Sequence, residues 1–102
     1  MHVVEIFLPL RDDQGRRFGA ELYGAVREEL VQRFGGLTAF TRSPAEGLWE
    51  KKEGERSQDE IVIFEVMTDR LDRGWWGGYG TKLEKMFQQE VIVIRAREVE
   101  QL

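Results

Sequence analysis

Three charged residues stand inside apolar segments of this 102-residue chain and are the first candidates for chemistry. Glu5 interrupts the segment Val3 to Leu10, Glu65 interrupts Asp59 to Thr68, and Arg95 lies in a third apolar segment near the end. A carboxyl group buried beside a second one has a raised pKa and can act as a base, while an arginine orients an anionic or carbonyl substrate. The same residues also suit an ion pair inside a buried dimer interface, because buried charges are normally paired, and this structural interpretation is favoured.

Aromatic residues form a second candidate group. Trp49, Trp75, Trp76 and Tyr79 could make an aromatic wall, although aromatic residues at helical spacing are more typical of a core. Trp75 sits beside the expected core stripe, so its side chain is expected to face solvent or a partner. The sequence assigns no catalytic residue, and the candidate ligand or interface cluster consists of Glu5, Glu65, Arg95, Trp49 and Trp75.

The residue types predict no metal site and no cofactor. Cysteine is absent, which excludes thiolate ligands and disulfides and favours the cytosol. His2 is the only histidine, and its spacing of three from Glu5 places the two on opposite faces of a strand. A frayed terminal histidine is the expectation. The segment Gly77 to Gly80 lacks the Gly-Lys-Ser/Thr ending of a phosphate loop.

Length and charge limit the classes of protein further. A chain of 102 residues is expected to form one domain over residues 1–102. The formal net charge of -4 argues against nucleic acid, whose phosphates need a concentrated positive patch. No apolar run has the length of a membrane span, and the first residues are expected to form a strand rather than a signal peptide.

Hydrophobic periodicity predicts four strands and two helices. Apolar residues at spacings of four predict a helix over Phe18 to Phe34, which Asp12 or Asp13 would cap and Gly35 would end. A second helix is expected after a cap at Thr68 or Asp69, with its glycine-rich first turns irregular or mobile. The first expected strand is Val3 to Leu10. The second is Leu37 to Arg42, which bends at Ser43-Pro44 and could resume over Leu48 to Glu50. An exposed connection from Glu50 to Glu60 leads to the third strand, Asp59 to Thr68, and the last strand is Val91 to Val99.

This order predicts an α+β fold of the ferredoxin-like βαββαβ type, with both helices on one face of an antiparallel sheet. Alternation along the strands then leaves the other face too apolar for water, and such a surface usually marks an interface or a ligand groove. The residues assigned to that face, besides the three charged ones, are Val3, Phe7, Ile61, Ile63, Met67, Val91 and Val93.

Three short motifs carry a resemblance to a known group. They are Phe34-Gly35-Gly36-Leu37-Thr38, Glu46-Gly47-Leu48-Trp49 and Phe87-Gln88-Gln89-Glu90-Val91. With these motifs the chain resembles ferredoxin-like proteins of the dimeric α+β barrel type, in particular small bacterial members. That group includes cofactor-independent oxygenases, haem-degrading enzymes and members without an assigned activity, so the resemblance implies a fold and a homodimer but no catalytic residue. The histidine placement of a haem ligand is missing.

Two functions are compatible with these residues and motifs. The first is a non-enzymatic homodimeric binding or interaction module, whose open sheet face takes a second copy or a small apolar or anionic ligand. The alternative is a small cofactor-independent enzyme, oxygenase-like or isomerase-like, that acts on an aromatic or polyketide-like compound in an apolar cavity. A cavity lined by Glu65 and Arg95 would favour the enzyme. RNA binding is disfavoured, because the central strand carries Ile61, Ile63 and Glu65 where exposed aromatic residues are needed.

Overall fold

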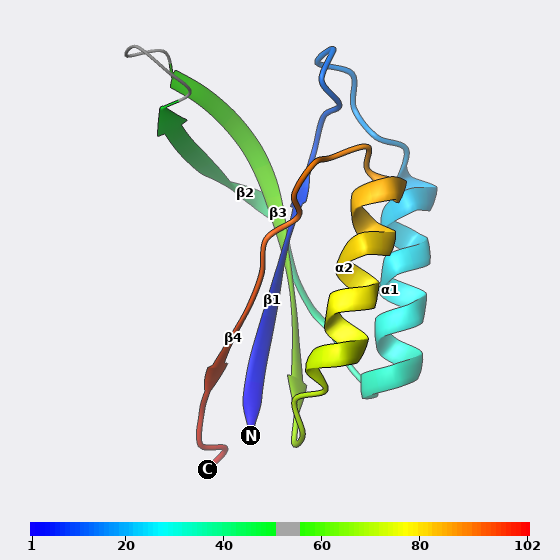
Figure 1. Ribbon diagram of the computed structural model, residues 1–102, viewed down its shortest axis with the longest axis vertical. Helices are drawn as coiled ribbons and strands as arrows, with labels where there is room; N and C mark the ends of the chain where they lie inside the picture. Colours follow the sequence, from blue (N-terminus) through cyan, green and yellow to red (C-terminus); the bar gives the residue numbers. More distant parts are fainter. Residues whose placement is uncertain (51–55) are drawn as a thin grey trace.

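The computed structural model describes the backbone of residues 1–50 and 56–102 and the side chains of residues 1–40 and 61–102. The elements follow in the order β1 (His2–Pro9), α1 (Ala20–Phe34), β2 (Thr38–Glu50), β3 (Arg56–Thr68), α2 (Arg73–Met86) and β4 (Ile94–Glu98). The strands pair antiparallel in the order β2-β3-β1-β4. Both helices lie on one side of the sheet (Figure 1). These features confirm the predicted ferredoxin-like α+β fold.

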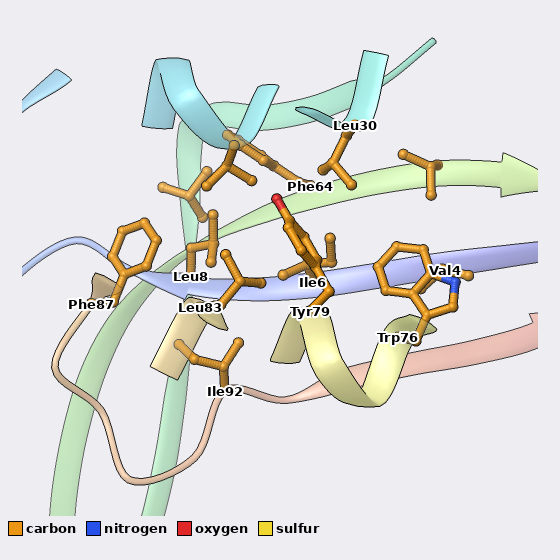
Figure 2. Close-up of a cluster of buried hydrophobic side chains, with 13 residues drawn as sticks. Val4, Ile6, Leu8, Leu30, Phe64, Trp76, Tyr79, Leu83, Phe87 and Ile92 are labelled. Atoms are coloured by element: carbon orange, nitrogen blue, oxygen red, sulfur yellow. The ribbon is translucent and has the colours of Figure 1, made fainter. Parts of the chain in front are cut away.

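The core lies between the two helices and the central strands β1 and β3. Alternate residues of β1 point toward the helices, and Val4, Ile6 and Leu8 are almost fully buried there. Phe64 and Val66 of β3 lie beside them in the same layer. Figure 2 shows the labelled residues of β1 and Phe64 of β3 meeting large side chains of both helices. Burial of this apolar surface is the main driving force of folding.

The first helix begins two residues later than the periodicity predicted. Its N-cap is Gly19, which makes no side-chain capping hydrogen bond. Asp12 closes the preceding loop instead of capping the helix, because its Oδ1 accepts the backbone amides of Gln14 and Arg16, each at 2.9 Å. These bonds, foremost that from the Arg16 amide, lower the pKa of the Asp12 carboxyl. Gly35 ends the helix with φ 81°, as expected for a left-handed C-terminal residue.

The second helix is capped by Asp72 and not by Thr68 or Asp69. The Oδ1 atom of Asp72 accepts the Trp75 amide at 3.0 Å, whereas the Thr68 hydroxyl donates to the Arg70 carbonyl. The helix is continuous across its glycines, so the expected irregularity of the first turns is wrong, while their mobility stays a prediction. Packing explains the difference, because buried Trp76 and its neighbours hold the helix on the sheet.

Three strand boundaries differ from the sequence-based ranges. The bend expected at Ser43-Pro44 is a register shift inside β2, between Phe40 and Ala45, and β2 continues to Glu50. β3 begins at Arg56, so most of the expected connection between these strands is itself strand, and residues 51–55 lie outside the described residues. In Figure 1 the far ends of β2 and β3 curve away from the helices. The last strand β4 is shorter than predicted and begins at Ile94.

Two tyrosines reach the core with different hydroxyl environments. Tyr23 donates to the Pro9 carbonyl at 2.6 Å. The Tyr79 hydroxyl is buried, points toward Leu30 and Phe64 in Figure 2, and has no hydrogen-bond partner within residues 1–40 and 61–102. Burial raises the pKa of both hydroxyls, and for Tyr79 the Glu29 carboxylate raises it further.

Neither described helix has the length and hydropathy of a bilayer span.

The two tyrosines should respond oppositely to removal of the hydroxyl. Tyr23→Phe loses a hydrogen bond and should lower the free energy of unfolding by about 1 kcal/mol, whereas Tyr79→Phe removes an unpaired polar group and should leave it unchanged or raise it. A tyrosine whose pKa is raised in the folded protein leaves the free energy of unfolding at its full value while the pH stays below the ordinary pKa of 10.0. The free energy of unfolding falls as the pH rises beyond 10.0, because the hydroxyl ionises more easily in the unfolded chain. Urea unfolding at about pH 7 and about pH 10.5 measures both effects, and Tyr79→Phe should gain on the wild type at the higher pH. A larger loss in Tyr79→Phe than in Tyr23→Phe would contradict this assignment.

Candidate functional site

The face of the sheet that the helices leave uncovered, here called the open face, carries a row of charged residues. Glu65 of β3 lies directly opposite Glu5 of β1, and Glu5 lies directly opposite Arg95 of β4. Thr38 of β2 continues the row beyond Glu65. Adjacent strands are about 4.8 Å apart, so the three charged residues that the sequence singled out stand side by side across three strands.

Glu5 and Arg95 form the ion pair of this row. The Arg95 Nε donates to Glu5 Oε1 at 3.0 Å, and the Arg95 guanidinium carbon lies 4.8 Å from the centre of the Phe7 ring. The Glu5 side chain is 15% exposed, but that of Arg95 is 62% exposed. The protein therefore desolvates the carboxylate and leaves most of the guanidinium in water, which keeps the net energy of such a pair small.

Glu65 and Arg97 lie on the same face as this ion pair. Glu65 is half-buried and faces Glu5, and Arg97 follows two residues after Arg95 on β4. Within residues 1–40 and 61–102 the structure shows no hydrogen bond or ion pair to either side chain. In this part of the chain the open face thus holds two carboxylates and two guanidinium groups, of which one of each is paired.

Apolar residues flank the charged row on both sides. One flanking row runs from Phe40 through Ile63 and Phe7 to Val93, whose carbonyl accepts the Phe7 amide at 3.0 Å. Phe40 is 48% exposed and Val93 47% exposed. On the other side Met67, 44% exposed, lies opposite Val3. Exposed apolar side chains that form contiguous rows are typical of a binding surface.

A shallow depression of about 510 Å³ lies where the open face meets the outer edge of the sheet. Its lining residues are Glu5, Arg95, Ala96 and Arg97. Two guanidinium groups side by side are suited to a carboxylate or phosphate oxygen. Glu65 does not line it, so it is not the cavity between Glu65 and Arg95 that would favour an enzyme. No group of three or more His, Asp or Glu side chains placed to hold a metal ion occurs among the residues searched, 1–40 and 61–102.

The structure places Trp75 away from the charged row. Its ring stacks on Tyr79 with centroids 4.8 Å apart, and the Arg33 guanidinium carbon lies 4.2 Å from its centre. Trp75 is half-buried in the helix layer, on the other side of the sheet from Glu5, and packs against the core. Trp49 lies outside the residues whose side chains are described.

Two features of the sheet were missed from the sequence. Phe40 belongs to the open face, and the alternation of Thr38 with Phe40 in the expected second strand was the signal for it. His2, expected as a frayed end, pairs with Thr68 and Glu98 in the sheet, and its Nε2 lies 3.8 Å from a Glu98 oxygen. Its register partners place it on the face opposite to Glu5, as the spacing predicted.

Comparison with known proteins identifies the fold. No family model and no curated protein matches the chain. Among solved structures, a phage SAM lyase in complex with S-methyl-5′-thioadenosine superposes with a TM-score of 0.64 at 17% identity, over 95% of this chain and 80% of that one. The divalent cation tolerance protein CutA1 of Thermus thermophilus has a TM-score of 0.64 at 15% identity, over 99% and 86%. A PII-like CutA of Nostoc sp. PCC 7120 has a TM-score of 0.57 at 14% identity, over 98% and 82%.

These neighbours have the small ferredoxin-like fold of CutA1 and PII-like proteins, and this chain shares it. At such identities the likeness concerns the fold alone, and the named activities differ among the neighbours themselves. Any function must therefore be argued from the open face.

The Glu5–Arg95 pair should show a modest coupling energy in a double-mutant cycle. Glu5→Gln, Arg95→Met and the double variant are compared by urea unfolding, and we expect a coupling of about 0.5 to 1 kcal/mol because Arg95 is largely hydrated. The matched control is Glu29–Lys82, at 2.8 Å, whose carboxylate side chain is 35% exposed and whose coupling should be smaller. A coupling energy of zero for Glu5–Arg95 would show that the ion pair adds nothing to the free energy of unfolding.

Proposed function

We propose that this protein is a non-enzymatic binding module that forms a homodimer through its open face, giving a dimeric α+β barrel in the cytosol. The observation that carries the proposal is the pair of apolar rows that flank the Glu5–Arg95 ion pair. Phe40, Met67 and Val93 are each close to half exposed in the protomer, on the face that the helices leave uncovered. A second sheet packed over β3, β1 and β4 would remove Met67 and Val93 from water.

The charges of the open face favour a second copy over other partners. Among residues 1–40 and 61–102 the face carries Glu5, Glu65, Arg95 and Arg97, which is two charges of each sign. A surface with balanced charges attracts neither a polyanion nor a strongly acidic or basic protein. It suits a partner with the same balanced charges, and a dimer with two-fold symmetry supplies one because the same patch meets itself.

Light scattering coupled to size-exclusion chromatography tests the assembly. The wild type at micromolar concentration should have twice the mass of the chain, and Met67→Lys should be monomeric because an unpaired charge buried in the interface costs about 3 to 5 kcal/mol. Val31→Lys is the matched control, since Val31 is 46% exposed on α1, away from the open face. A monomeric wild type would overturn the proposal, as would a dimer that Val31→Lys disrupts and Met67→Lys does not.

A second candidate is a small cofactor-independent enzyme or ligand-binding protein, and the depression beside Arg95 and Arg97 favours it. Its size falls within the range of small-molecule sites, and the two guanidinium groups select an anionic group on the ligand. The apolar rows beside it suit an aromatic or polyketide-like body. Glu5, which accepts from Arg95, is the carboxylate nearest to such a ligand.

Amide chemical shifts during titration test this candidate. The probes are aromatic carboxylates, together with S-methyl-5′-thioadenosine as the compound bound by one fold neighbour. Shifts should gather at the amides of Glu5, Arg95 and Arg97. They should disappear in Arg97→Met but persist in Lys85→Met, whose position is exposed on α2, on the helix side of the sheet. Shifts that stay unchanged in Arg97→Met, or that are absent at millimolar probe, would reject the candidate.

A further inference from the structure

We infer that the two copies pack about a two-fold axis parallel to β1, so that Glu65 of each copy pairs with Arg95 of the partner subunit. This inference rests on the proposed homodimer and specifies its symmetry and its polar contacts. It follows from the order of charges across the open face, and it assigns a role to Glu65, which no contact within the described residues explains.

The charge order leaves Glu65 without a cationic partner among residues 1–40 and 61–102. The row reads Glu65, Glu5, Arg95 on three adjacent strands, and two strand spacings separate Glu65 from Arg95 by about 10 Å. Arg95 meets Glu5 through its Nε, and Glu65 lies between Thr38 and the like-charged Glu5. A carboxylate in this position is tolerated while water reaches it, and becomes costly once a second sheet covers the face.

The symmetry of the dimer decides which residue covers Glu65. A two-fold axis that runs perpendicular to the strands and crosses the charged row places each strand over its own copy, so Glu65 would meet Glu65 and Arg95 would meet Arg95 of the partner subunit. An axis that runs parallel to β1 and lies over it reverses the order of the strands, so β3 lies over β4 of the partner subunit. Glu65 then meets Arg95 of the partner subunit, and this contact occurs twice. Glu5 meets Glu5 of the partner subunit on the axis, where each carboxylate keeps the Arg95 of its own copy. The second arrangement thus has two attractive contacts against one between like charges, whereas every contact of the first joins like charges.

The Arg95 side chain suits this double role. Its Nε donates to Glu5, its side chain is 62% exposed, and its terminal nitrogens make no hydrogen bond or ion pair with another described residue. Packed sheets lie about 10 Å apart, a gap that an arginine and a glutamate extended toward each other can span. The same operator places Ile63 near Val93 of the partner subunit, which joins apolar residues of the neighbouring row. The charged row and the row of Ile63 and Val93 therefore agree on this symmetry, while β2 with Phe40 lies beyond the strands that the partner subunit covers.

Charge reversal separates this pairing from dimerisation itself. In Glu65→Arg the charges of the row are Arg, Glu, Arg. Glu5 gains a second cationic neighbour within the protomer. At both symmetry-related contacts, however, the new arginine faces Arg95 of the partner subunit. The dissociation constant of the dimer should rise about 100-fold while the protomer stays folded. Glu65→Arg combined with Arg95→Glu reads Arg, Glu, Glu, the reverse of the natural order. It restores both the pair with Glu5 and the pairs across the axis, so it should return the dissociation constant to within about tenfold of the wild type.

Sedimentation equilibrium of the full chain measures these constants, with circular dichroism as the check on folding. Glu28→Arg is the matched control, because it reverses the same charge at an exposed position of α1 and should leave dissociation unchanged. A wild-type dimer that Glu65→Arg does not weaken, or that the double variant does not recover, overturns the pairing and leaves the homodimer standing. A wild-type monomer overturns the homodimer, and a mass of three chains overturns the two-fold axis.

Discussion

The pairing of β1 with β3 in a single register is the constraint on which the rest of this structure depends. It sets Ile6 opposite Phe64 on the helix side and Glu5 opposite Glu65 on the open side. A slip of one residue would turn Val4, Ile6 and Leu8 away from the helices and bring the carboxylates into the core. The cost of both errors is large, so the apolar core and the charged row enforce the same register from opposite faces of the sheet.

The two faces of the sheet serve different ends. On the helix side, buried apolar residues supply the stability of the protomer, and the helices are held by packing rather than by helix propensity, as the continuous α2 with its glycines shows. On the open side, apolar rows remain half exposed and charged groups are incompletely paired. A face of this kind adds little to the stability of one copy, and its properties become intelligible as parts of a contact with a partner.

The sequence was sufficient for the fold and for the charged row, because both follow from the two-residue period of strands and from the order of the elements. It was not sufficient for features that depend on competition between neighbours. Asp72 rather than Asp69 caps α2 because packing of Trp76 decides where the helix starts. Trp75 turned out to stack on Tyr79, since a residue beside a core stripe is drawn in wherever a ring can cover it. Neither outcome is readable from periodicity.

A row of charged residues across an apolar surface adds a desolvation cost to any interface formed there, and this cost is useful only if the charges restrict how the interface forms. Replacing it with leucines would bury more apolar area, but a uniformly apolar face would accept another sheet in many registers and orientations. Charges in the order Glu65, Glu5, Arg95 are unsymmetrical across the sheet, so most ways of stacking two copies place like charges together. In the proposed dimer the row would thus favour one arrangement of the two copies by penalising the others. The row crosses β1, the strand whose register the core already holds most firmly.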